Sequence, residues 1–140
     1  MSQFAAELIA EPQAISALTD RVATFLAGCG VDARAAHHMA LVLDELLTNV
    51  ATHSEGPEAP VSVNLTVAPD RVSAEVVDQG GMFDPRTAPV PDLSGGVAER
   101  PIGGLGLLLV QKVTQSLNYE RAGNRNKTTF SISRAANHEA

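Results

Sequence analysis

Hydrophobic positions along this chain recur at two spacings, one typical of helices and the other typical of strands. In residues 12–27 and 32–53, apolar side chains return every three or four positions, which predicts two amphipathic helices. Residues 61–67 alternate strictly between apolar and polar, and 72–78 repeat this alternation after the turn-forming residues 68–71. The middle of the chain is therefore predicted to be a helix pair followed by a β-hairpin.

The flanking segments extend this pattern. Residues 4–10 predict a first strand at a sheet edge, and residues 104–114 have a helical period. Alternation at 117–119 and 128–134, on either side of a turn at 122–126, predicts a second hairpin. Strands that pair mainly antiparallel, with about three helices on one face, give an α+β fold. The expected architecture is a two-layer sandwich with a mixed, mostly antiparallel five-stranded sheet.

The 140 residues are expected to form one domain, 1–140, because a chain of this length buries about two-thirds of its unfolded surface. No periodic pattern runs through residues 79–103, which are rich in Pro, Gly and Ser. So long a loop is uncommon in a compact chain unless it covers a site, so residues 84–103 are expected to be a lid. Residues 135–140 are expected to be a disordered tail.

Charge and cysteine content narrow the possible partners and location. A formal net charge of −6 argues against non-specific nucleic-acid binding and against attraction to anionic membranes, so neither is expected as a direct partner. The single cysteine, Cys29, excludes an internal disulfide and fits a reducing compartment. No signal peptide is evident, and no apolar run approaches the roughly 20 residues of a membrane span. A cytoplasmic location is expected.

Two polar residues, Glu45 and Asn49, interrupt the apolar pattern of the helix predicted for residues 32–53. They are one helical turn apart and therefore lie on the same helix face, while Leu43 and Leu46 occupy another side. A carboxylate and a carboxamide set beside a core stripe indicate a chemical role or a cap.

A second polar cluster follows the first hairpin, where Asp78 and Gly80 come at the end of the strand predicted for residues 72–78. A carboxylate at a strand end can accept a hydrogen bond from an exocyclic amine, such as that of adenine. A glycine beside it lets the backbone approach the base, because it has no Cβ. The alternative interpretation is an ordinary Asp-Gly turn.

A third cluster, Gly103-Gly104-Leu105-Gly106-Leu107, opens the helix predicted for residues 104–114. Glycine amides at a helix N-terminus present unpaired N–H groups and the positive end of the helix dipole, which commonly bind phosphate. The cluster lacks the Gly-Lys-Ser/Thr ending of a P-loop and does not directly follow a strand, as a dinucleotide-binding turn would. The alternative is a flexible hinge leading into a helix.

Taken together and in this order, the three clusters resemble the motifs of the GHKL family of ATP-binding proteins, which includes gyrase, Hsp90, histidine kinases and MutL and has the Bergerat fold. Its N box corresponds to Glu45 and Asn49, and its two glycine boxes correspond to residues 78–80 and 104–106. The sequence is most similar to the bacterial anti-sigma factor and serine-protein-kinase branch. The similar segments are Asp-Glu-Leu-Leu-Thr-Asn-x-x-x-His at 44–53, Asp-x-Gly-x-x-Phe-Asp-Pro at 78–85, and Gly-Gly-Leu-Gly-Leu-x-Leu-Val at 103–110.

The resemblance implies a role for residues of each box. Glu45 resembles the general base that takes a proton from a substrate hydroxyl, or from water, as the γ-phosphoryl of ATP is transferred. Asn49 resembles the side-chain oxygen ligand of Mg²⁺, a cation that prefers oxygen donors. Asp78 resembles the adenine anchor, with Gly80 and Met82 lining the base pocket.

The same resemblance places further residues at the nucleotide. Thr128 resembles a threonine that assists the adenine-binding aspartate, although Thr129 is adjacent. His53 is expected either to contact phosphate or to end its helix. Arg100 lies two residues before Ile102, where this branch often has an arginine, and would reach the phosphates if the lid folds over. The phosphate-facing turn comprises Gly103, Gly104, Leu105, Gly106 and Leu107.

The function implied by the resemblance is that of an ATP- and Mg²⁺-dependent serine/threonine protein kinase that also acts as an anti-sigma factor in a partner-switching pathway. Its partners would be a sigma factor and a small anti-sigma-factor antagonist that it phosphorylates, and it would form a homodimer. Two alternatives stay open: a nucleotide-gated binding module without transferase activity, and a partner-switch regulator whose target is not a sigma factor. Thr52 and Ile102 replace basic residues frequent in this branch, which favours the binding module, whereas Glu45 favours the kinase.

Overall fold

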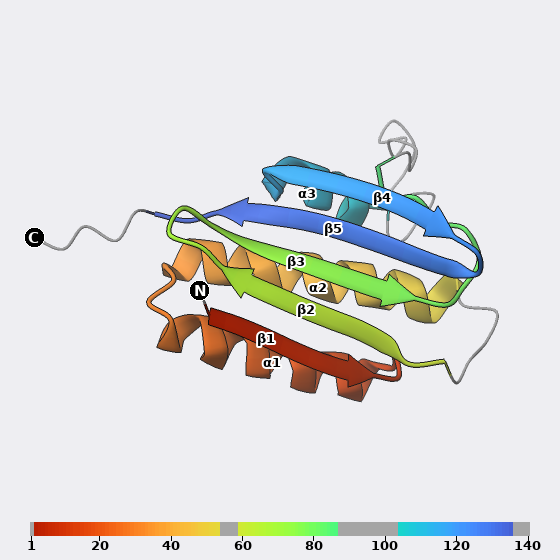
Figure 1. The fold of residues 1–140 in the computed structure, drawn as a ribbon, viewed down its shortest axis with the longest axis horizontal. Coiled ribbons are helices and arrows are strands. Elements are labelled where there is room, and N and C mark those ends of the chain that lie inside the picture. Colours follow the sequence, from red (N-terminus) through yellow and green to blue (C-terminus); the bar gives the residue numbers. More distant parts are fainter. Residues whose placement is uncertain (1, 54–58, 87–103, 136–140) are drawn as a thin grey trace, which may run out of the picture.

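The computed structural model describes residues 2–53, 59–86 and 104–135, which form five strands and three helices of an α+β fold (Figure 1). Every element expected from the sequence is present, and most boundaries agree to within two residues. In chain order the elements are β1 (Ser2–Leu8), α1 (Pro12–Gly28), α2 (Ala33–His53), β2 (Val61–Val67), β3 (Arg71–Asp78), α3 (Gly104–Val113), β4 (Ser116–Ala122) and β5 (Arg125–Ser133).

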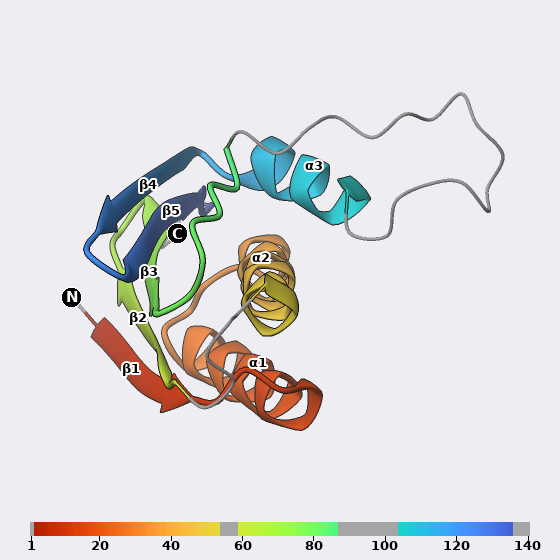
Figure 2. The same cartoon turned by 90° about the vertical axis from the view of Figure 1, so that its right-hand side faces the viewer.

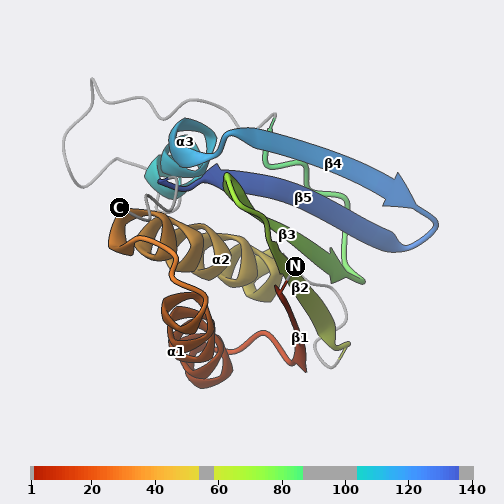
Figure 3. The ribbon, with the colours of Figure 1, turned by 60° about the vertical axis from the view of Figure 1, so that its left-hand side comes forward.

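The sheet has the strand order β1-β2-β3-β5-β4, and each pairing in this order is antiparallel. The three helices cover one face of the sheet, which confirms the expected two-layer sandwich (Figure 2). Helix α1 lies towards the β1 edge and α3 towards the β4 edge, with α2 between them (Figure 3). None of the described helices combines the length and apolar character needed to cross a bilayer.

The hydrophobic core lies between α1, α2 and the inner face of the sheet, and α2 contributes its largest side chains. Met39, Leu43 and Leu47 are fully buried, one helical turn after another along α2. They pack in one cluster with the inward-facing positions of the strands, where alternation buries residues such as Val63 and Leu65. Each such aliphatic side chain contributes roughly 1.5–3 kcal/mol through burial, so this packing fixes α2 against the sheet.

Asp32 joins the start of α2 to the end of β5. Its Oδ2 accepts a hydrogen bond from the backbone N–H of Ala35 at 3.2 Å, so Asp32 is the N-cap of this helix. Its Oδ1 accepts from the backbone N–H of Ala135 at 2.9 Å, and this bond is the main reason that the pKa of Asp32 is lowered. Ala135, the first residue of the expected tail, is thus bonded to Asp32, and the other residues of that segment, 136–140, lie outside the described residues.

The second hairpin differs from the sequence prediction, because its turn is shorter. The predicted turn covered residues 122–126, whereas Ala122 pairs with Arg125, leaving only Gly123 and Asn124 in the loop. Gly123 has a φ of 61°, as the first central residue of a type II′ turn requires. Three residues of the predicted turn, Ala122, Arg125 and Asn126, belong to the strands instead, so Asn126 is part of β5.

Candidate functional site

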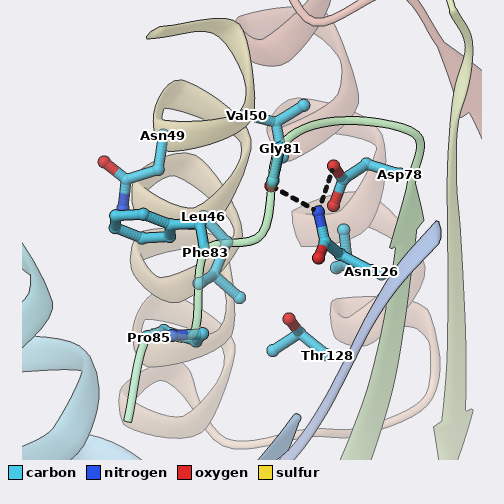
Figure 4. A pocket seen from close by; sticks show the side chains of 10 residues that line it. Leu46, Asn49, Val50, Asp78, Gly81, Phe83, Pro85, Asn126 and Thr128 are labelled. Carbon is cyan, nitrogen blue, oxygen red and sulfur yellow. Dashed lines mark hydrogen bonds between the residues drawn. The ribbon is translucent and has the colours of Figure 1, made fainter. Parts of the chain in front are cut away.

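A cavity opens where the last turns of α2 face the end of β3 and the neighbouring part of β5 (Figure 4). Its walls are mainly apolar, with a few polar side chains among them. Three residues predicted from the sequence, Asn49, Asp78 and Thr128, line it together. The full lining is Leu46, Asn49, Val50, Val76, Asp78, Gly81, Phe83, Pro85, Asn126 and Thr128. Apolar walls with a few convergent polar groups are typical of a small-molecule site.

Asp78 provides the only carboxylate among the described residues that line this cavity. It is the last residue of β3 and only 9% exposed. Burial raises the pKa of its carboxyl, while the hydrogen bond from Asn126 and the positive charge of Arg121 act to lower it. A buried acceptor between apolar walls is suited to a ligand that is flat, apolar on its faces and has a donor at its edge.

Asn126 supports this carboxylate and was not among the residues predicted for the site. It lies opposite Asp78 in the β3–β5 register, and its Nδ2 donates to Asp78 Oδ2 at 3.1 Å and to the Gly81 carbonyl at 2.9 Å. Its Oδ1 accepts from Arg121 Nη1 at 2.9 Å and from the hydroxyl of Tyr119. Sequence reasoning missed this network, because the predicted turn excluded Asn126 from a strand.

The chain that follows β3 turns so that alternate residues face the cavity. Gly81 and Phe83 line it, whereas Met82 between them is 75% exposed and does not. Gly80 was also expected at the base pocket. Its carbonyl oxygen accepts a hydrogen bond from Arg121 Nη1 at 2.6 Å. Sequence spacing identified the correct segment but assigned the inward-facing position to Met82.

Pro85 connects this segment to α3. Its carbonyl oxygen accepts a hydrogen bond from Gln111 Nε2 at 2.9 Å, so the wall of the cavity is tied to the third helix. The following residue, Arg86, forms an ion pair with Asp84 at 2.8 Å, and the bonds from Arg86 lower the pKa of the Asp84 carboxyl. Most of the predicted lid, residues 87–103, lies outside the described residues.

Asn49 and Glu45 have different surroundings, although they lie on one face of α2. Asn49 lines the Asp78 cavity, and its Nδ2 is buried with no hydrogen-bond partner among the described residues. Glu45 instead lines a second pocket between α2 and α3, together with Gly106, Leu109 and Val110. The two cavities are adjacent on α2, one helical turn apart.

Gly106 brings the first turn of α3 directly against the Glu45 carboxylate. A Cβ on Gly106 would lie 1.8 Å from Glu45 Oε1, so a larger residue there would require the Glu45 carboxylate to move. Burial raises the pKa of Glu45, and the negative charge of Asp44 raises it further, whereas the carboxamide of Asn49 acts in the opposite direction. The result is a carboxylate with increased proton affinity beside a helix N-terminus, which suits a general base.

The remaining predicted residues lie on several elements, and only some of them line the cavity. Thr128 lines it and is buried, whereas Thr129 lies on the opposite face of β5 in a groove of the open sheet face, as strand alternation requires. Leu107 is buried. His53 is the last residue of α2. Gly104 and Leu105 begin α3, and Arg100 and Gly103 lie outside the described residues.

The donor chemistry of the site fits Mg²⁺ of the kind that accompanies a phosphate ligand. No cluster of three or more His, Cys, Asp or Glu able to hold a metal occurs among the described residues. Mg²⁺ that binds with phosphates takes only one or two oxygen ligands from the protein, with waters and phosphate oxygens as the others. Asn49 Oδ1 is an oxygen donor of this kind, on a side chain that lines the cavity.

Sequence comparison identifies related proteins. The profile of the histidine kinase-like ATPase domain matches residues 8–132 of this chain. A serine/threonine-protein kinase of Bordetella bronchiseptica, BtrW, is 32% identical over 100 residues, which make up 70% of this chain and 70% of that protein.

Solved structures give the same fold. The RsbU and RsbW domains of Rv1364c from Mycobacterium tuberculosis match 97% of this chain with a TM-score of 0.69 and 16% identity; this chain spans only 34% of that one. The catalytic domain of the histidine kinase ThkA matches with a TM-score of 0.54 and 13% identity, over 97% of this chain and 99% of its own. Both likenesses concern the arrangement of helices and strands alone.

Proposed function

Because this chain belongs to the family of histidine kinase-like ATPase domains, we propose that it is an ATP- and Mg²⁺-dependent serine/threonine protein kinase that also acts as an anti-sigma factor. The observation that carries the proposal is the grouping of Asp78, Asn49 and Thr128 around one cavity, with Glu45 one helical turn away against α3. In this proposal, β3 supplies the base-binding acceptor, and α2 supplies both the metal ligand and the general base.

The Asp78 cavity receives the adenine of ATP in this proposal. The buried carboxylate accepts from the exocyclic amine, and Thr128 assists it from β5. Val50 and Val76 lie on the apolar wall that the faces of the base contact. A buried hydrogen bond to a charged acceptor contributes roughly 1.5–3 kcal/mol, which is enough to decide between bases.

The triphosphate extends from this cavity towards α3. Mg²⁺, when bound, neutralises charge on the phosphates, and Asn49 Oδ1 is its protein ligand. The turn at residues 103–107 and Arg100 complete the phosphate site, and His53 contacts the phosphates or ends α2. Glu45 takes the proton of the attacking Ser or Thr hydroxyl, for which its raised pKa is suited.

The partners that we propose are a small anti-sigma-factor antagonist, which is phosphorylated, and a sigma factor, which is sequestered when the antagonist is phosphorylated. The likeness to BtrW supports the kinase assignment, and the likeness to a chain that contains an RsbW domain is consistent in fold. We further propose that the chain is a single domain, forms a homodimer and works in the cytoplasm.

A specific assay tests the kinase proposal. The purified protein is incubated with γ-labelled ATP, Mg²⁺ and host lysate, beside the Glu45→Gln variant, which keeps the shape of the side chain but removes the base. We expect one small protein to become labelled on Ser or Thr by the wild type, and labelling to fall by about 100-fold or more in the variant. Glu120→Gln, an exposed change on β4, is the matched control and is expected to label normally.

One observation favours a second candidate, a nucleotide-gated binding module without transferase activity. Glu45 does not line the cavity of Asp78 and Asn49 but a separate pocket. If the wild type binds ATP and captures a partner, yet labels nothing, the binding module is the correct function. A labelled partner that controls an output other than a sigma factor would identify the chain as a different kind of partner-switch regulator.

A further inference from the structure

The carboxamide of Asn126 uses all of its hydrogen-bonding capacity inside the protein. An asparagine side chain has two N–H donors and an oxygen with two lone pairs. The two donors serve Asp78 Oδ2 and the carbonyl of Gly81, and the oxygen accepts from Arg121 and Tyr119. The residue is 3% exposed, so water competes little for these bonds. These four bonds fix its position, and Figure 4 shows the two that its nitrogen donates, to Asp78 and Gly81.

The direction of this carboxamide follows from the partners of its oxygen. Arg121 is only a donor, because a guanidinium has no acceptor, so the atom that faces Arg121 Nη1 at 2.9 Å is the oxygen Oδ1. The nitrogen must then face Asp78 and the Gly81 carbonyl, both of which accept. Arg121 also donates to the Gly80 carbonyl at 2.6 Å, so the strand and the following loop are held by the same two side chains.

This arrangement leaves the two oxygens of Asp78 in different states. Oδ2 is held by Asn126, whereas no group among the described residues donates to Oδ1. The carboxylate lines the cavity and cannot turn without losing the bond to Asn126. One oxygen is thus committed to the protein and the other is available to a ligand.

We propose that Asn126 is a positioning residue that makes the cavity select purines with an amine at C6, such as adenine, over purines with an oxygen at C6, such as guanine. This inference rests on the proposed function, since it assumes that Asp78 receives the edge of the base. Adenine presents an amine donor where guanine presents a carbonyl oxygen. A carboxylate that is fixed as an acceptor binds the donor and repels the oxygen. Asn126 holds the carboxylate in place. Discrimination between adenine and guanine therefore depends on Asn126, although Asn126 acts only through Asp78.

Binding measurements test the inference without requiring catalysis. Dissociation constants for ADP and GDP are measured by calorimetry on the full chain for the wild type, Asn126→Leu, Asp78→Asn and the double variant. In Asn126→Leu we expect ADP to bind about tenfold more weakly and the preference for ADP over GDP to fall by a similar factor. In the Asp78→Asn background, Asn126→Leu should weaken ADP binding by less than a further factor of about two, because the carboxylate through which Asn126 acts is absent.

Tyr119→Phe removes one hydroxyl that bonds Asn126 and preserves the packing of the ring. It therefore tests the role of Asn126 even if Asn126→Leu does not fold. We expect its preference for ADP to fall by about twofold to threefold. An unchanged ADP-to-GDP ratio in the folded Asn126 variant, or additive losses in the double variant, would overturn the inference while Asp78-dependent ADP binding still supports the proposed function. A wild type that binds neither nucleotide overturns both.

Discussion

At the scale of single residues, the site is built from groups that burial makes unfavourable for the fold. Asp78 and Glu45 both have raised pKa values, and burial is the largest cause for each. Asn49 Nδ2 is buried with no partner in the described part of the chain. Such groups cost stability in the absence of a ligand. They are expected at functional sites, where a protein keeps buried polar groups that bind or react with a ligand. Their cost can be measured as a change in the stability of the fold.

The pH dependence of the free energy of unfolding measures the stability cost of burying Glu45. Its pKa is raised above the ordinary value of 4.5, so between that pH and the raised pKa the folded protein keeps a proton that the unfolded chain has lost. The wild type therefore loses stability as pH rises through the raised pKa. Glu45→Gln removes this loss, so its melting temperature should exceed that of the wild type at about pH 7 and match it at about pH 4. Thermal unfolding by circular dichroism measures both.

Glu120→Gln, at an exposed position on β4, is the control for this comparison. It is expected to show no gain at neutral pH, because that carboxylate remains in water. If Glu45→Gln changed stability equally at both pH values, the cause would be packing rather than ionisation.

At the scale of elements, the β4–β5 hairpin determines which residue lies beside Asp78. Its two-residue turn fixes the register of the hairpin, and the β3–β5 pairing places Asn126 opposite Asp78. A shift of one residue would direct Asn126 to the open face of the sheet. Gly123 is therefore important for the site, although it makes no contact with it.

Substitution of Gly123 should be costly for backbone reasons alone. A Cβ at its φ of 61° is strained, so Gly123→Ala is expected to destabilise the fold by roughly 1–2 kcal/mol. Gly28→Ala is the matched control, since Gly28 ends α1 without a positive φ and a Cβ added there would meet nothing within 4 Å. That change should be neutral or stabilising by up to about 1 kcal/mol. Urea denaturation measures the free energy of unfolding of both variants. Equal changes in the two would show that the positive φ of Gly123 is not the cause of the loss.

The sequence predicted the elements well because their signals are local. Strict alternation in β2 and the helical period of α2 reflect neighbours within a few positions, and both elements formed as expected. Asn126 could not be found in this way, because its partner Asp78 is 48 positions away and meets it only through strand pairing. The separation of Glu45 from the cavity depends likewise on where α3 packs. Motif spacing identified candidate residues, whereas tertiary packing decided which of them share a cavity.

At the scale of the whole molecule, binding and folding are linked. A ligand that binds only the folded chain stabilises it, by about 2.7 kcal/mol at a concentration 100 times its dissociation constant. For a chain of this length, we expect ADP with Mg²⁺ to raise the melting temperature by about 10 °C under that condition. Asp78→Asn, at the same ADP concentration, should show less than about half of this rise, because its affinity is lower.

Differential scanning fluorimetry measures these shifts, and inorganic triphosphate is the control ligand. It lacks the base and should raise the melting temperature much less than ADP does. Equal rises for the wild type and Asp78→Asn would show that the nucleotide binds the folded chain at a different place.

Gly106 also bears on how descendants of this chain can diverge. Because a Cβ there would overlap the Glu45 carboxylate, a lineage that acquires alanine at position 106 displaces that carboxylate, the proposed base, in one step. The walls and the acceptor of the Asp78 cavity would remain intact, so such a copy would still take up nucleotide. Selection would then no longer maintain the acidic residue at position 45. In a genome with several duplicates of this gene, position 106 would separate those that still transfer phosphate from those that have become receptors.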